Sequence, residues 1–304
     1  MQFGKLAAVI ATVALLGVSQ AQAQQQERAR AFVDSVSFTS SSNALARWTN
    51  RICVGAVGLA PDQARALVDR ISERAQAVGL RAGAPGCTAN VMVIYAPDSD
   101  RLSREIIDQR RDLLGYSRDD DRWTLGQDAM NAFANEQRAV RWWHVSSVGR
   151  GSLRPTDGTT YQPSGQSAAQ AAATGDGAGN GTGASPTSDL QGAQGVRSHG
   201  SRVRNEAHNS LTYALVVVDA RRVANLPADA WMDYVALVSL AQIDASAQTD
   251  AYPTVLNLFS GPNPPTGLTP WDVAFLEGLY DARDEPGNRQ AAAISRRMAS
   301  VAAE

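Results

Sequence analysis

The segment WMDYVALVSLAQID, from Trp231 to Asp244, carries apolar side chains on nearly every side when it is drawn as a helix. A helix that is apolar all round belongs either in a membrane, which takes about 20 residues to cross, or in the core of a large domain. The chain has 304 residues and a hydrophobic content of 44%, enough to bury such a helix. The expected core residues are Val235, Leu237, Val238 and Leu240.

Strand-like and helix-like segments alternate along the chain, which is typical of an α/β or α+β fold with a mixed sheet. The strand-like run at 51–58 precedes a helix that starts at Pro61 and stops at Gly79. A second strand, at 90–96, completes a unit whose right-handed crossover makes the two strands parallel neighbours. Further helices are expected over about 100–114, 125–138, 227–244, 269–283 and 288–302, and further strands over 139–148 and 211–220.

The expected layout is one α/β domain in two parts, residues 48–149 and 201–304. Between them, residues 150–200 consist mainly of Gly, Ala, Ser, Thr and Gln, with too few apolar side chains to offset the entropy of ordering. This composition predicts a flexible, disordered insertion. Residues 24–47 are polar and rich in serine, and we expect an extended lead-in there with room for one strand.

The first 23 residues are typical of a signal peptide. Lys5 precedes an apolar run over 6–18, and Ala21-Gln22-Ala23 has the small-x-small form of a cleavage site. We expect cleavage after Ala23, a periplasmic or secreted mature chain and no membrane span in it. A retained anchor is the alternative, although the apolar run is shorter than the roughly 20 residues that a spanning helix needs.

Export permits disulfides, and the chain has two cysteines, Cys53 and Cys87. We predict one bridge between them, which would pin the first strand to the entry of the second. Two buried free thiols are the alternative. The formal net charge is −2, so no basic excess favours binding to nucleic acid.

Few residues are candidates for catalysis or metal binding. His199 and His208 are nine residues apart, which does not match the spacing of a zinc helix or a zinc finger. His144 lies on the same face of the strand at 139–148 as Trp142, which is typical of a half-buried strand histidine. The sequence also lacks a Gly-x-Ser-x-Gly nucleophile elbow.

Three aspartates flank apolar segments and are possible site acids: Asp219, Asp233 and Asp244. Strand ends and helix first turns favour aspartate for structural reasons as well. If Asp233 lies in a first turn, where it interacts only with the helix dipole, its replacement by asparagine is expected to change little.

The C-terminal third resembles a secreted bacterial family of zincin-like metalloprotease relatives. The resemblance is carried by the order of strand YALVVVDA, helix YVALVSLAQID, loop YPTVLNLF and helix LTPWDVAFLEGLYDAR. It covers roughly residues 51–283 less the insertion, and its most specific part is the helix at 268–283. In active members of that family, the helix equivalent to 231–244 carries His-Glu-x-x-His.

This chain departs from the family at that motif. No histidine follows His208, and no register of the 231–244 helix places two metal ligands one turn apart. We therefore predict no catalytic, metal-binding or cofactor-binding residue. The expected function is that of an exported, non-catalytic scaffold with a binding or structural role in the cell envelope, whose 139–148 strand receives an unidentified protein or peptide. The alternative is a periplasmic hydrolase or peptidase with an atypical site built from His144, His208 and Asp219.

Overall fold

The computed structural model of the chain describes residues 22–37, 45–114, 127–150, 207–282, 285 and 287–301. Residues 1–21 of the predicted signal peptide and residues 151–200 of the predicted flexible insertion lie outside the described residues, as does His199. Signal cleavage and the flexibility of the insertion therefore stay predictions.

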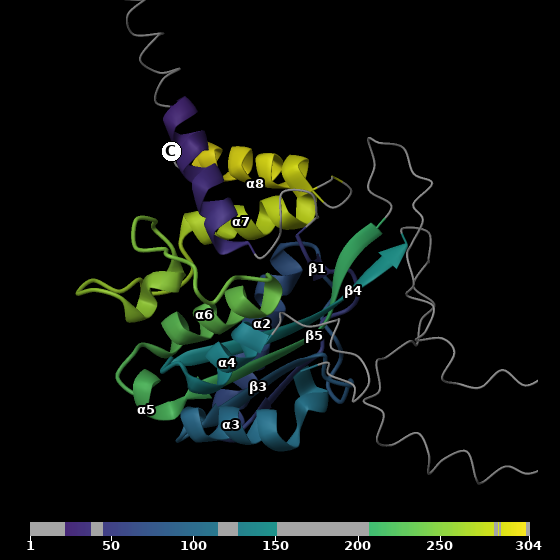
Figure 1. The fold of residues 1–304 in the computed structure, drawn as a ribbon, viewed down its shortest axis with the longest axis vertical. Coiled ribbons are helices and arrows are strands. Elements are labelled where there is room, and N and C mark those ends of the chain that lie inside the picture. The colour runs from purple at the N-terminus through teal and green to yellow at the C-terminus, as the bar shows by residue number, and fades with distance from the viewer. Residues whose placement is uncertain are drawn as a thin grey trace, which may run out of the picture.

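A mixed sheet of five strands forms the centre of the fold, as the sequence predicts (Figure 1). Its strands are β1 (Arg47–Trp48), β2 (Val54–Val57), β3 (Val91–Ala96), β4 (Val140–Arg150) and β5 (Ala207–Asp219). β2, β3 and β5 are parallel neighbours in the order β2-β3-β5. β1 also runs parallel to β5 and pairs with its start, on the side where β3 pairs with its end. β4 runs antiparallel to β5 on its other side, with a register shift between Val145 and Ser146.

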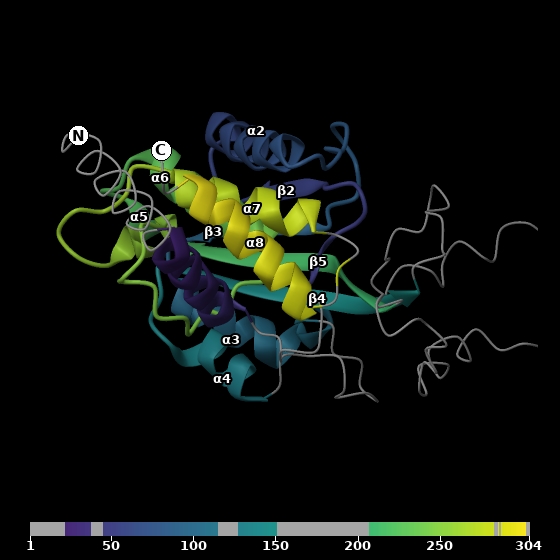
Figure 2. The same cartoon turned by 90° about the horizontal axis from the view of Figure 1, so that it is seen from above.

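Helices cover both faces of this sheet (Figures 1 and 2). The described helices are the N-terminal one over 22–36, α2 (Pro61–Ala77), α3 (Ser99–Gln109), α4 (Gln127–Asn135), α5 (Ala220–Val223), α6 (Ala228–Leu240), α7 (Pro270–Asp281) and α8 (Gly287–Val301), with 3-10 turns η1 (Arg111–Leu114) and η4 (Val255–Phe259). α2 and α6 lie on one face and α3 and α4 on the other. The α7–α8 pair lies beyond α6, beside the N-terminal helix.

The N-terminal helix corrects the prediction of an extended lead-in. Residues 22–36 are helical, and four apolar side chains at 29, 32, 33 and 36 are buried. Phe32 makes edge-to-face contacts with Tyr252, Trp271 and Phe275. The four positions have the i, i+3, i+4, i+7 spacing of a helix, a signal that the polar composition around them hides. All four buried positions follow Ala23, so the mature chain predicted by signal cleavage would retain them.

α6 is buried along most of its length, as its apolar sequence predicts. Every residue from Ala230 to Leu240 is buried, including the four expected core residues. The helix packs between the sheet, α2 and the α7 layer. No described helix is both long and apolar enough to cross a membrane.

Truncation of Leu240 tests this packing. Leu240 is completely buried, so Leu240→Ala is expected to leave a cavity and to lower the free energy of unfolding by about 2 to 5 kcal/mol. The measurement is urea unfolding of the purified mature protein. A loss below about 1 kcal/mol, the range of exposed positions, would contradict the buried placement of α6.

The predicted disulfide is present. Cys53 and Cys87 are bonded, with their Cα atoms 6.0 Å apart. Cys53 directly precedes β2, and its carbonyl oxygen accepts hydrogen bonds from the backbone N–H groups of Asn90 and Val91 at the start of β3. The bridge thus closes a loop at the point where β2 and β3 meet.

We expect thiol labelling of the unreduced, denatured protein to find no free cysteine. The sequence separation of 34 residues predicts that the double variant Cys53→Ala/Cys87→Ala loses roughly 3 to 4 kcal/mol of stability in the chain-entropy model. Two labelled thiols per chain would contradict the bridge.

Asp233 has a larger role than the sequence indicates. It lies in the second turn of α6, it is buried, and its two carboxylate oxygens accept hydrogen bonds from Arg74 of α2 at 3.0 and 2.9 Å. Arg70 of α2 lies 3.6 Å away, and the backbone N–H of Leu268 donates to Asp233 Oδ2 at 3.0 Å. Asp233 therefore joins α2, α6 and the start of the α7 layer.

Asp233→Asn is consequently expected to cost about 1 to 3 kcal/mol, because a neutral amide leaves two arginines without their shared carboxylate. The expected loss of stability is smaller than for a fully buried ion pair because both arginines keep contact with water. The matched control is Asp62→Asn, which breaks an exposed pair with Arg65 and should cost less than about 1 kcal/mol. Equal stabilities of the two variants would contradict this role.

Candidate functional site

The histidine that the sequence singles out caps a helix. His144 lies in β4 and is buried, and its Nε2 donates a hydrogen bond to the Val238 carbonyl oxygen of α6 at 2.7 Å. A carbonyl can only accept, so Nε2 carries a proton. Burial lowers the pKa of His144 from 6.5 to about 4, against the opposing effect of the Val238 hydrogen bond. His144 is therefore neutral near pH 7.

The other carbonyl groups at the end of α6 also have donors. The last four carbonyls of a helix have no partner further along it. Here Ala241 N–H donates to Leu237, Trp48 Nε1 donates to Ser239 at 2.8 Å, and the Tyr280 hydroxyl donates to Leu240 at 2.7 Å. With His144, these donors satisfy the whole buried end of α6 from β1, β4 and α7.

The neutral state of His144 predicts a loss of stability in mild acid. The folded-state pKa lies below the unfolded value of 6.5, so the stabilisation is present above pH 6.5 and is lost as the pH falls toward about 4. The free energy of unfolding should drop by about 2 kcal/mol between pH 7.5 and pH 5, where most carboxylates stay ionised in both states.

The control is His144→Gln, whose side-chain amide can still donate to the Val238 carbonyl but does not titrate. Its unfolding free energy is expected to change much less between pH 7.5 and pH 5 than that of the wild-type protein. The same drop in both proteins would show that another group causes the acid sensitivity.

Asp219 is the centre of a polar network at the carboxyl ends of β3 and β5. It is fully buried, and it accepts hydrogen bonds from the N–H and hydroxyl groups of Ser99 and from the N–H groups of Arg221 and Arg222. Burial raises the pKa of Asp219, but these hydrogen bonds outweigh the effect and hold it below its usual range. Asp219 thus caps α5 and binds it to the start of α3.

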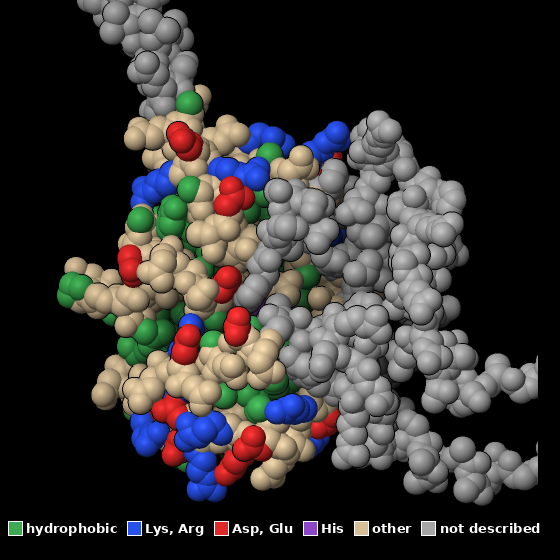
Figure 3. All heavy atoms as spheres, viewed as in Figure 1, with side chains coloured by type: hydrophobic (Ala, Val, Ile, Leu, Met, Phe, Trp, Pro, Cys, Tyr) green, Lys and Arg blue, Asp and Glu red, His purple; other side chains and the backbone are tan. Residues whose placement is uncertain are grey.

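Two arginines complete this network. Arg222 forms a bidentate pair with Asp100 at 2.9 and 2.8 Å. Arg141 of β4, which is buried, also pairs with Asp100 and donates to Ser99 Oγ at 2.6 Å. Hydrogen bonding to Arg222 is the largest effect on Asp100 and lowers its pKa. Charged side chains gather at this end of the molecule, over α3 and α5 (Figure 3). Since each carboxylate has its own basic partner, the network stabilises the fold.

The structure does not bring the three atypical-site candidates together. His144 pairs with Ala214 in the β4–β5 ladder, and His208 pairs with Gly149 further toward the start of β5. At about 3.3 Å per residue, Asp219 lies roughly 16 Å along β5 from the His144 position and roughly 35 Å from His208. A catalytic base and its partner must be within hydrogen-bond reach, so these residues do not form one site.

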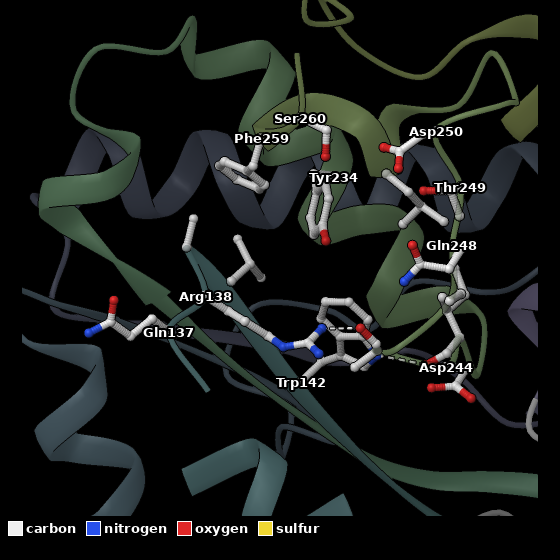
Figure 4. Close-up of a pocket in the computed structure, with 16 residues that line it drawn as sticks. Gln137, Arg138, Trp142, Tyr234, Asp244, Gln248, Thr249, Asp250, Phe259 and Ser260 are labelled. Atoms are coloured by element: carbon white, nitrogen blue, oxygen red, sulfur yellow. Dashed lines mark hydrogen bonds between the residues drawn. The ribbon is translucent and has the colours of Figure 1, made fainter. Parts of the chain in front are cut away.

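A cavity of about 290 Å³ opens elsewhere, where the start of β4 faces α6 (Figure 4). Arg138 and Trp142 form one side, Tyr234 of α6 lies at the back, and η4 with Phe259 forms another side. The segment over 243–250 closes the remaining side. Trp142 Nε1 and Arg138 Nη1 hold this segment by donating to the carbonyls of Ile243 and Ala245. The sequence predicts Trp142 in a strand, but nothing in it indicates that the 243–250 segment packs against this residue.

Tyr234 is the polar group at the back of this cavity. Its side chain is 6% exposed, yet its hydroxyl donates no hydrogen bond to any residue that the structure describes. The hydroxyl oxygen is not among the completely buried side-chain atoms that lack a partner, so it meets the open space of the cavity. Burial raises the pKa of Tyr234, so the hydroxyl stays protonated. It can therefore exchange hydrogen bonds with a bound molecule.

No family model, curated protein or solved structure matches the chain. The function therefore has to be argued from the site itself. Within the described ranges, no three histidine, cysteine or acidic side chains gather closely enough to hold one metal ion. The cavity contains Asp244 from the sequence-predicted candidates, and its other principal residues, Tyr234, Arg138 and Phe259, were not among them.

Proposed function

We propose that the chain is an exported, non-catalytic binding protein that receives an extended peptide segment along β4. The observation that carries the proposal is the cavity between β4 and α6, with the unpartnered Tyr234 hydroxyl in its wall. A concave site on which several polar groups converge is a common form of binding site.

The backbone of β4 supports a peptide ligand. Asp219 N–H donates to the Ala139 carbonyl, so this pair is a hydrogen-bonded one. Such pairs alternate in an antiparallel ladder, and the backbone groups of Val140, Trp142 and His144 therefore point away from β5. Within the described part of the chain, no other strand or backbone group bonds to them. Val140 and His144 are themselves buried, so a bound strand has to displace the groups that now cover this edge. An added strand would satisfy these groups, as in other cases of β-strand addition.

The composition of the cavity favours binding over hydrolysis. Among its described lining residues there is no histidine and no cysteine, and no hydrogen bond between described residues links the Tyr234 hydroxyl to a carboxylate that could activate it. Asp244 Oδ1 instead accepts from the N–H and hydroxyl of Ser246, which orders the 243–250 segment. The lining thus offers a shaped surface and hydrogen-bonding groups.

We further propose that the scaffold is zincin-like. The support is the parallel β2–α2–β3 unit, the antiparallel β4 beside β5 and the buried α6 that follows β5. In α6 the side chains that face the core are apolar, where an active relative would carry metal ligands. On this proposal, the helix is kept for packing and the neighbouring groove for binding.

Peptide binding can be tested with a random library of acetylated hexapeptides, selected on the mature protein and followed by calorimetry of the selected sequences. Val140→Pro removes an N–H that points away from β5 and should weaken binding at least tenfold. Val140→Ala is the matched control, because it keeps the N–H and should weaken binding less than threefold. A failure of the wild-type protein to select any peptide would contradict the proposed function.

Metal content separates the binding protein from the hydrolase. We expect less than 0.1 equivalent of zinc in the mature protein after dialysis, because the described residues offer no set of three ligands. The measurement is elemental analysis of protein purified without chelators. One equivalent of zinc bound tightly by the mature protein would overturn the proposal of a non-catalytic protein.

A further inference from the structure

The rim of the β4–α6 cavity carries unbalanced negative charge. Asp244 and Asp250 line it, and no arginine of the described chain forms an ion pair with either one. Asp250 points toward the space in front of Tyr234 (Figure 4). The nearby basic group Arg28 lies instead over the ring of Tyr252 and donates to the Ala251 carbonyl.

The one basic side chain in the lining is already neutralised. Arg138 forms an ion pair with Glu136, and its Nη1 donates to the carbonyl of Ala245. Glu136 therefore balances much of its charge, and the part that reaches Tyr234 opposes the effect of burial on the pKa of that hydroxyl. A bound group that enters the cavity meets a local excess of carboxylate.

Three aromatic side chains line the cavity beside its polar groups. Trp142 and Tyr234 meet edge to face with their ring centroids 6.0 Å apart, and Tyr234 and Phe259 do so at 5.1 Å. Phe259 is 39% exposed, one of two large apolar side chains that the described fold leaves exposed. Aromatic faces attract ammonium and guanidinium groups, and most strongly where water is excluded.

We propose that this cavity binds the basic side chain, arginine or lysine, of the extended peptide that pairs with β4. The apolar stem of such a side chain would lie against the aromatic walls, and its charged end would reach Asp250 and the Tyr234 hydroxyl, which can accept a hydrogen bond. The volume of about 290 Å³ is at the lower end for small-molecule sites and fits a single side chain. This inference rests on the proposed function and specifies which side chain of the bound peptide the cavity recognises.

The test uses a positional-scanning set of acetylated hexapeptides in which one position is fixed and the others are random. The fixed residue is arginine, its neutral isostere citrulline, or norleucine. We expect the best arginine pool to bind the mature protein at least tenfold more tightly than the matching citrulline pool, and the difference to shrink as salt is raised. Asp250→Asn should reduce this preference at least threefold, and Tyr234→Phe should weaken the arginine pool by a similar factor. Asp62→Asn, which removes an exposed carboxylate of α2, is the control and should leave the preference unchanged.

The outcomes separate the two proposals. Equal binding of the arginine and citrulline pools would overturn the basic specificity and leave peptide binding intact. Binding of agmatine alone, as tightly as the best arginine pool, would overturn the peptide as the ligand, since the strand backbone would then contribute nothing. If no pool binds the wild-type protein, both proposals fail together.

Discussion

The end of α6 is the constraint on which the rest of the structure depends. An apolar helix can be buried in the core only if its last carbonyl groups find donors there, because an unsatisfied buried carbonyl costs about 1 to 3 kcal/mol. Trp48, His144 and Tyr280 supply those donors from β1, β4 and α7. Three elements far apart in the chain are thereby fixed around one helix end, and burial keeps the histidine among them neutral.

Charged groups connect the remaining layers. At the carboxyl end of the sheet, Asp100 and Asp219 bind Arg141 and Arg222 and so join β4, β5 and α3. On the face of the sheet that α2 and α6 cover, Asp233 joins these two helices. Each of these carboxylates has a basic partner, unlike those at the rim of the cavity. This difference is the reason why the proposed ligand contact is assigned to the rim carboxylates.

The cavity follows from the same arrangement. Along β4, Trp142 and His144 direct their side chains toward α6, and the N–H and carbonyl groups of the same residues point away from β5. The 243–250 segment leaves the capped end of α6 and returns along β4, where Trp142 and Arg138 hold it. A site with aromatic walls and a strand edge thus results from how α6 ends.

The sequence by itself determined the buried α6, the parallel strand pair, the alternation of β4 and the pairing of the two cysteines, because these follow from local periodicity and from an even cysteine count. It did not determine the part of Asp233 in joining α2 to α6. It also gave no indication that Tyr234, Asp250 and Phe259 line one cavity. Those features depend on contacts between segments far apart in the chain, and a polar or aromatic residue shows its partner only when tertiary packing has brought that partner to it.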